Sequence, residues 1–269
     1  MSFRNVLLHN SLTEKIAYKQ TNQIKIGESA HFHMPESKSR NNKVDISGKN
    51  NEVNISDGQT VHGSVIHIAG ESNKIQIGLN SNTYDFSDNS IRILGNRNTI
   101  EIEDGTRLTS CNLFICGDDN LIHIGKDCSL MLTGIHMEQN CNQARIDEGC
   151  TFHGRDLSMA ELVMDEGTSI VFKKDCMVSN DVKIRSSDSH SIVDSEGHRL
   201  NPAADITIAE HTWICFGSII LKGFANGKNT VIAAGSLCTK PIADEHVIIG
   251  GNPAKVIKRE VDWDRKFVK

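Results

Sequence analysis

The chain has 269 residues, a formal net charge of −5 and an aromatic content of only 5%. This length supports one or two domains with a sizeable core, and the scarcity of aromatic residues favours a thin core built from strands. A net negative charge does not favour binding to nucleic acid, and the longest apolar runs are too short to span a bilayer. The first residues contain no cleavage site of a signal peptide, so a cytoplasmic protein is expected.

A short phrase, in which Asn is followed by alternating apolar and polar residues, repeats in the first half of the chain. It occurs at residues 51–55, 73–77, 98–102, 120–124 and 142–146. Such alternation is typical of a strand that buries one face, and turn-forming residues follow most of the phrases. Short strands at a period of about 20 residues, without helical segments between them, predict a parallel β-solenoid over residues 24–163. Residues 1–23, which precede it, either cap its end or are mobile.

From residue 164 to residue 260 the repeat shortens to six residues. Its apolar positions are Phe172, Val178, Ile184, Ile208, Ile214, Ile220 and Ile232. Four positions after most of them stand residues that are mostly small or compact: Cys176, Val182, Thr212, Ser218, Phe224 and Ser236. Six residues make one short strand and a corner, so three repeats close a triangular coil with the apolar residues inside. Asn226 stands where Ile or Val is expected, and it forms either an internal contact or a bulge.

The six-residue phase is lost in a polar segment, residues 186–206, which contains the string SSDSHSIVDSEGHRLNP. Ile184 and Ile208 are 24 positions apart, a multiple of six, so the phase is the same on both sides of the segment. A loop extruded from an intact coil is therefore expected. At the other end of this region, residues 261–269 predict a short C-terminal helix that caps the solenoid. The predicted fold class is thus all-β, a continuous solenoid with one extruded loop.

Several strings resemble those of the left-handed β-helix O-acetyltransferases, which are built from hexapeptide repeats. They are SDSHSI at residues 187–192, TWI at 212–214, AAGS at 233–236, TK at 239–240 and GNPAKVIK at 251–258. Within that family the sequence is most similar to enzymes that acetylate bacterial polysaccharides. The resemblance implies a left-handed coil, acetyl-CoA as the acetyl donor, and a homotrimer with active sites in grooves between neighbouring prisms.

By this resemblance, His190 is the base that takes a proton from the acceptor hydroxyl. An alcohol is a poor nucleophile at neutral pH, so a positioned imidazole suits the task. Asp188 either orients that imidazole or caps the turn before the loop. Trp213 is expected to project outward and, by the resemblance, to lie beside the reacting groups. Direct transfer in a ternary complex is expected, rather than an acetyl group carried by Cys215, a position at which the family commonly has Gly.

The resemblance also indicates residues for the two substrates. The candidate acetyl-CoA residues are Gly217, Ser218, Ala234, Gly235, Thr239, Lys240, Lys255, Lys258 and Arg259. A backbone N–H near Gly217 would stabilise the oxyanion, and the cations of the last strand would bind the phosphates. Arg199 and Asn201, at the end of the polar segment, are candidate contacts to the sugar. No metal is expected.

Two other functions stay open on the sequence. A solenoid without a catalytic role could be a scaffold or adhesin, which predicts repeats without a phase-breaking polar loop. Some left-handed β-helix trimers are zinc carbonic anhydrases, and His62 and His67 are five positions apart, with His31 and His33 upstream. The remaining histidines outside the loop are expected to be exposed on strands or corners: His123, His136, His153, His211 and His246.

The favoured interpretation is a cytoplasmic O-acetyltransferase that uses acetyl-CoA and acts on a capsule, O-antigen or exopolysaccharide. A peripheral association with a polysaccharide assembly complex is compatible with it. The eight cysteines contain no CxxC pair, so most of them are expected to be reduced and packed inside the coils.

Overall fold

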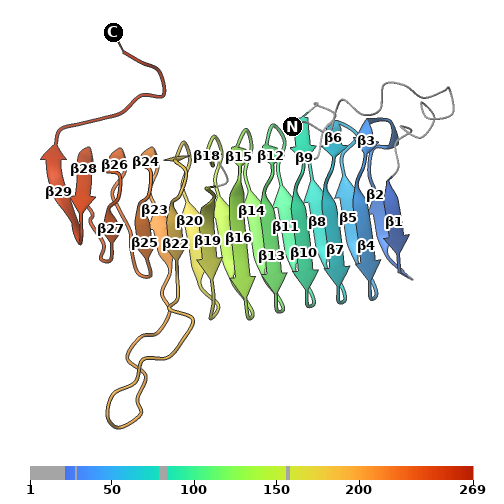
Figure 1. The fold of residues 1–269 in the computed structure, drawn as a ribbon, viewed down its shortest axis with the longest axis horizontal. Helices are drawn as coiled ribbons and strands as arrows, with labels where there is room; N and C mark the ends of the chain where they lie inside the picture. Colours follow the sequence, from blue (N-terminus) through green and yellow to red (C-terminus); the bar gives the residue numbers. More distant parts are fainter. Residues whose placement is uncertain (1–21, 28, 79–83, 156–157, 269) are drawn as a thin grey trace, which may run out of the picture.

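The computed structural model describes residues 22–27, 29–78, 84–155 and 158–268. The predicted N-terminal segment, residues 1–23, lies outside this description except for its last two residues. Regular structure in the described residues is almost entirely strand, with one short 3-10 helix, η2 (Glu36–Lys38). The strands stack into an elongated solenoid from which one long loop projects (Figure 1). No helix in these ranges is long and apolar enough to cross a membrane.

Three sheets run the length of the solenoid, and the chain visits them in turn. Sheet A contains β1 (Gln23–Ile26), β4 (Lys43–Ser47), β7 (Val65–Ala69), β10 (Ser90–Leu94), β13 (Asn112–Cys116), β16 (Thr133–Glu138), β19 (Ala160–Met164), β22 (Lys183–Arg185), β25 (Ile219–Leu221) and β27 (Leu237–Cys238). Sheet B contains β2 (His31–His33), β5 (Glu52–Ile55), β8 (Lys74–Ile77), β11 (Thr99–Ile102), β14 (Leu121–Ile124), β17 (Gln143–Ile146), β20 (Ser169–Phe172) and β23 (Ile206–Ile208). Sheet C contains β3 (Ser39–Arg40), β6 (Gln59–His62), β9 (Tyr84–Ser87), β12 (Arg107–Thr109), β15 (Ser129–Met131), β18 (Thr151–His153), β21 (Met177–Val178), β24 (Thr212–Ile214), β26 (Thr230–Ile232), β28 (Val247–Gly251) and β29 (Ala254–Arg259).

The predicted repeats supply the core. On β11, Ile100 and Ile102 are buried inside the coil, whereas Thr99 and Glu101 lie on its outer face. All seven apolar positions of the six-residue repeat are fully buried. Each strand pairs in parallel with its counterparts one coil before and after, and only the final pair, β28 and β29, is antiparallel among the strands described. The prediction of an all-β parallel solenoid is confirmed.

The repeated Asn residues form a stacked ladder inside the corner between sheets A and B. The side-chain amide of Asn98 donates to Oδ1 of Asn73 (3.0 Å) and to the carbonyl of Gly117 (2.8 Å). Oδ1 of Asn98 in turn accepts from the backbone N–H and the side-chain amide of Asn120, at 2.9 and 3.0 Å. Burying an amide costs free energy unless it is hydrogen-bonded. Here the side chain of each Asn forms a hydrogen bond with the Asn of the neighbouring coil. The ladder, which continues to Asn51 and Asn142, therefore fixes how one coil stacks on another.

Asn226, the exception in the six-residue repeat, makes an internal contact. Its side-chain amide donates to Oγ1 of Thr212 (2.8 Å), and its Oδ1 accepts from the backbone N–H of Ala209 (3.3 Å). The coil also continues across the polar segment, because Phe172 pairs with Ile208 in register. The segment is thus a loop extruded from an intact coil, as the phase predicts.

The predicted C-terminal helix is wrong, because residues 261–268 contain no helix. This segment, called the C-terminal strap below, lies extended along the side of the solenoid and contacts several coils. The ring of Trp263 stacks on His211 with centroids 4.2 Å apart, and its indole N–H donates to the His211 carbonyl (2.9 Å). Arg265 donates to Asp175 (3.0 Å) and to Thr151 (2.7 Å). A helix would withdraw these side chains from partners on successive coils, so the extended form is favoured.

His211 is half-buried beneath the strap rather than exposed as predicted, and its charge makes the strap sensitive to pH. Burial lowers the pKa of His211, but the hydrogen bond with Asp175, the Trp263 carbonyl and the nearby Asp262 raise it on balance above the usual 6.5. A group with a raised folded-state pKa stabilises the fold fully below its unfolded pKa, and this contribution is lost as the pH rises through the folded pKa.

We therefore expect the thermal unfolding midpoint of the wild type to exceed that of His211→Gln at about pH 5.5 and to approach it by about pH 8.5. The difference between the two proteins, measured by melting across this range, removes the pH effects of other groups. A difference that stays constant with pH would show that the charge of His211 does not hold the strap.

Candidate functional site

The loop of residues 186–205 is fastened at its base by the hydroxyl groups of three serines. Ser186 is buried, with its hydroxyl 2.6 Å from that of Thr168. Ser187 donates to Glu166 (2.7 Å), and Ser189 donates to Asp165 (3.1 Å). The run of serines in the sequence therefore builds a hydrogen-bonded base for the loop.

Asp188 binds the base of the loop and not the imidazole of His190. Its carboxylate accepts from the ammonium group of Lys222 and from the side-chain amide of Asn201 (2.7 Å). These hydrogen bonds hold the pKa of Asp188 below its ordinary value, and the bond from Lys222 has the larger effect. The same Asn201 amide donates to the backbone carbonyl of His190 (2.8 Å), and its Oδ1 accepts from Ile192 N–H (2.7 Å). Asn201 thus ties together the two sides of the loop.

Arg199, predicted to contact sugar, is engaged in the same way. Its guanidinium forms a two-bonded pair with Glu166, at 2.6 and 2.8 Å, and also reaches the Asn201 carbonyl. The bonds from Arg199 and Ser187 lower the pKa of Glu166 to about 2, so this pair stays charged at neutral pH. Arg199 and Asn201 position the loop through most of their hydrogen-bonding groups, and a direct contact to sugar stays a prediction.

His190 lies in the loop that these hydrogen bonds hold in place, and its side chain is exposed. Ser189, which precedes it, has a left-handed backbone with φ +62°, so the chain turns sharply there. Beyond it the loop forms a hairpin, in which Val193 bridges Arg199 and Asp194 accepts from the backbone of Glu196 and His198. The imidazole is therefore exposed to solvent on a backbone that is held in place by hydrogen bonds. This arrangement suits a side chain that contacts a second molecule.

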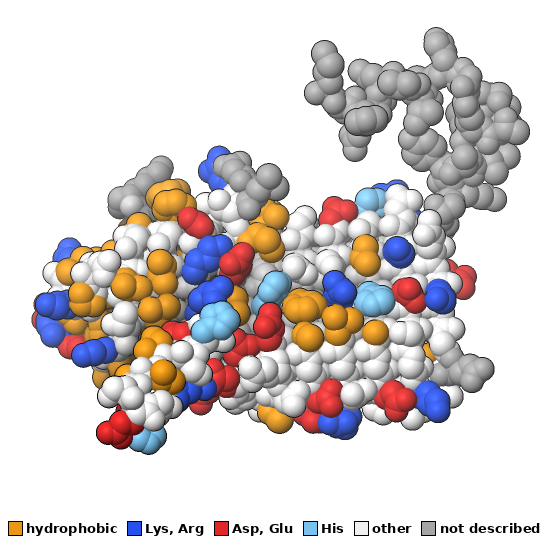
Figure 2. Space-filling view, turned by 60° about the horizontal axis from the view of Figure 1, so that its bottom comes forward, with side chains coloured by type: hydrophobic (Ala, Val, Ile, Leu, Met, Phe, Trp, Pro, Cys, Tyr) orange, Lys and Arg blue, Asp and Glu red, His pale blue; other side chains and the backbone are white. Residues whose placement is uncertain are grey.

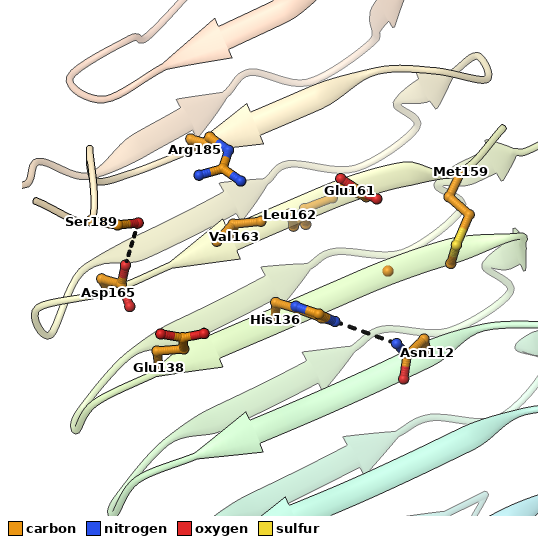
Figure 3. A pocket seen from close by; sticks show the side chains of 11 residues that line it. Asn112, His136, Glu138, Met159, Glu161, Leu162, Val163, Asp165, Arg185 and Ser189 are labelled. Carbon is orange, nitrogen blue, oxygen red and sulfur yellow. Dashed lines mark hydrogen bonds between the residues drawn. The ribbon is translucent and has the colours of Figure 1, made fainter.

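A groove of 390 Å³ lies beside the loop, over the outer face of sheet A (Figure 3). Its lining residues are Asn112, Gly134, His136, Glu138, Met159, Glu161, Leu162, Val163, Asp165, Arg185 and Ser189. His136 lies 3.3 Å from the amide of Asn112 and is half-buried here, whereas an exposed residue was expected. Ser189, which lines the groove, directly precedes His190 in the chain, and His190 itself is not among the lining residues.

Trp213 lies on the outer face of sheet C, away from this groove. It sits between Met177 and Val231 on the neighbouring strands, and its indole N–H donates to Ser179 (3.4 Å). The loop instead leaves the corner between sheets A and B. One chain by itself therefore does not bring Trp213 and His190 together in any contact among the described residues.

The candidate acetyl-CoA residues cluster near the C-terminal end of the solenoid. Gly217 and Gly235 lie on successive coils at the corner between sheets C and A, and both have φ +68° with open space around the Cα. Ala234 is exposed beside them, whereas the hydroxyl of Ser218 is buried and donates to the Cys215 carbonyl (2.9 Å). The backbone N–H groups of Gly217 and Gly235 donate to carbonyls of the preceding coil, at 3.3 and 2.9 Å, and the absence of side chains leaves open space for a long, thin ligand.

The other candidates lie on or after the last strands of sheets A and C. Thr239 and Lys240 follow β27, and Lys255 and Lys258 are exposed on β29, the last strand of sheet C. Arg259 is partly engaged, because it donates to Asp244. Exposed lysines on the last strand could pair with phosphates, so the residues fit the chemistry of a nucleotide thioester.

Two alternative chemistries find little support. Burial raises the pKa of Cys215 to about 11, which keeps the thiol protonated and disfavours an acetyl-cysteine. His62 lies on the outer face of sheet C and His67 on that of sheet A, so the two cannot share a metal within one chain. In the described ranges no three metal-ligating side chains converge. All eight cysteines are free, and five of them are buried.

The chain is similar to several acetyltransferases of known name or structure. The polysialic acid O-acetyltransferase of Escherichia coli O1:K1 / APEC is 34% identical over 106 residues, which are 39% of this chain and 34% of that protein. The polysialic acid O-acetyltransferase of Neisseria meningitidis is 29% identical over 108 residues, which are 40% of this chain and 50% of that protein. Among solved structures, the polySia specific acetyltransferase NeuO aligns with a TM-score of 0.62 at 27% identity, covering 78% of this chain and 84% of that one.

The chain is a homologue of these acetyltransferases. The resemblance to left-handed β-helix acetyltransferases seen in the motifs is thereby confirmed. The polysialic acid O-acetyltransferase OatWY shares the fold over 91% of this chain, with a TM-score of 0.53 and 24% identity. The sequence matches cover half or less of the length of these two curated relatives. No family model matches the chain.

Proposed function

We propose that the protein transfers an acetyl group from acetyl-CoA to a hydroxyl of a bacterial polysaccharide, with His190 as the general base. The observation that carries the proposal is the exposed imidazole, held by a hydrogen-bonded loop beside a groove, in a homologue of polysaccharide O-acetyltransferases. A scaffold or adhesin would not need a polar loop whose backbone is fastened by Asp188, Asn201 and Arg199.

The reaction requires one proton to move twice. His190 removes the proton of the acceptor hydroxyl while the oxygen attacks the thioester carbonyl carbon. Backbone N–H groups near Gly217 support the negative charge on the carbonyl oxygen. When the carbon–sulfur bond breaks, the imidazolium returns its proton to the departing thiolate, which leaves an ester, free coenzyme A and a neutral imidazole.

A complete site needs more than one copy of the chain. The loop with His190 leaves the corner between sheets A and B, whereas Trp213 and the glycine corner belong to sheet C and its edge with sheet A. A second copy that places its glycine corner against the loop would bring base, tryptophan and thioester together. A homotrimer with shared sites, as in the resemblance, meets this requirement, and we propose it for a cytoplasmic enzyme.

The proposal is tested with the full chain, radiolabelled acetyl-CoA and a panel of acidic and neutral bacterial polysaccharides. We expect release of coenzyme A that depends on one of the polysaccharides, with the label recovered in the polymer as an alkali-labile ester. Calorimetry with acetyl-CoA alone gives a second readout. Absence of acetyl-CoA binding by the folded protein would contradict the proposal.

A further inference from the structure

One of the residues that line the groove beside the loop, Asp165, has a buried carboxylate oxygen without a hydrogen-bond partner. Asp165 is only 4% exposed, and while its Oδ2 accepts from Ser189, its Oδ1 has no hydrogen-bond partner. Burial, with Glu138 and Glu166 nearby, raises the pKa of Asp165. A buried polar atom without a partner costs free energy, so the groove is prepared for a ligand that brings a hydroxyl or amide donor.

The groove is one end of a longer line of side chains on the outer face of sheet A. Cross-strand register aligns His67, Arg92, Phe114, His136, Val163 and Arg185 on six successive strands. The guanidinium of Arg92 lies 5.9 Å from the ring centre of Phe114, whose ring is 5.3 Å from that of His136. With strands about 4.8 Å apart, the line is roughly 24 Å long and runs parallel to the solenoid axis.

The far part of this line carries Arg92, His67 and apolar side chains, and it ends where Asp45 on the neighbouring strand β4 pairs with His67. The outer faces of β7, β10 and β13 carry Val65, His67, Ala69, Ser90, Arg92, Leu94, Asn112, Phe114 and Cys116. None of these nine is a carboxylate, although the chain has a net charge of −5. Figure 2 shows basic, histidine and hydrophobic side chains following one another along the solenoid. The carboxylates Glu138, Glu161 and Asp165 are gathered at the groove instead.

We propose that this line, from β22 to β7, is a binding track for several units of an anionic polysaccharide acceptor that lies along the solenoid axis. One unit occupies the groove, where Asp165 Oδ1 accepts from a sugar hydroxyl beside His190. The following units stack on Phe114 and pair their acidic groups with Arg92 and His67, since guanidinium groups bind carboxylates in a fork. The track rests on the proposed function and adds where, and in which direction, the acceptor lies.

The test compares Arg92→Glu and Phe114→Ala with the matched control Arg145→Glu, which adds the same charge on the outer face of sheet B. Polysialic acid is the probe, both as a long chain and as a trimer of the same sugar. The readouts are retention on immobilised long chain, the KM for each acceptor at saturating acetyl-CoA, and the mass in solution by light scattering.

We expect both track variants to be retained less and to raise the KM for the long chain about fivefold or more, because the outer units lose their contacts. The KM for the trimer should rise less than that for the long chain, the KM for acetyl-CoA should not change, and Arg145→Glu should behave as the wild type. The track is overturned if retention and long-chain KM are unaffected, if both acceptors are affected equally, or if the variants lose mass, which would mean that a second copy of the chain covers this face.

Retention separates the two proposals. A wild type that acetylates no acceptor removes the proposed function, yet a wild type retained on the polymer and an Arg92→Glu variant that is not retained still support the track. A wild type that is not retained on polysialic acid overturns the track.

Discussion

Replacing His190 with Ala is expected to lower the rate of acetyl transfer by a factor of about 10² to 10⁴, the usual contribution of a general base. The hydroxyl proton then has no acceptor in the loop, while the groove and the glycine corner are unchanged. Asn201 holds residue 190 through its backbone carbonyl, so the loop should keep its shape without the imidazole. The loss should therefore appear in kcat and not in the KM for acetyl-CoA.

The matched control is His198→Ala, in the same loop. His198 is exposed at the hairpin tip, where its imidazole lies 3.2 Å from Asp194. We expect this variant to keep most of its activity, and both variants to bind acetyl-CoA as the wild type does by calorimetry. If His190→Ala retained more than about a tenth of the activity, or if both variants lost equally, His190 would not be the base.

Replacing Asn98 with Leu is expected to lower the free energy of unfolding by about 2–4 kcal/mol. Leu has a similar volume but no hydrogen-bonding groups. The backbone N–H of Asn120 and the carbonyl of Gly117 would each lose the partner that Asn98 supplies inside the coil. Each unsatisfied buried group costs about 1–3 kcal/mol, so the ladder is interrupted in two directions.

Urea denaturation and hydrogen exchange both measure this effect. Because a solenoid is stabilised by contacts between neighbouring coils, exchange should accelerate first near Asn120 and little in distant coils. Glu101→Gln, on the outer face of the same strand, is the control and should change the midpoint little. A shift no larger than that of Glu101→Gln would show that the ladder contributes little to stability.

The fold could be predicted because its physical determinants are periodic. Each coil of a solenoid buries residues at equivalent positions. The repeated Asn motifs and the six-residue repeat therefore mark nearly all of the core residues. The C-terminal strap could not be predicted in this way. Its extended form depends on Trp263 stacking on His211 and on Arg265 reaching Asp175, residues 52 and 90 positions away, and no local pattern encodes such contacts.

The candidate site was only partly predictable for a similar reason. The loop and His190 stand out because they interrupt a regular phase and carry a recognisable string. Asp165, Glu166 and Lys222 gave no such signal, since an acidic pair before a glycine is typical of a turn and a single lysine of a solvated surface. Phe114 and His136 occupy outward positions, where the repeat tolerates any residue, so their alignment appears only when the coils are stacked.

The continuity of the coil beneath the loop has an evolutionary consequence. Strands β22 and β23 pair with β19 and β20 of the previous coil, whatever chain lies between Arg185 and Ile206. The coils therefore do not require a loop of any particular length. The loop only has to begin and end at the corner between sheets A and B. The loop and the scaffold can therefore change independently, and one loop can be exchanged for another in evolution while the coils beneath it stay the same.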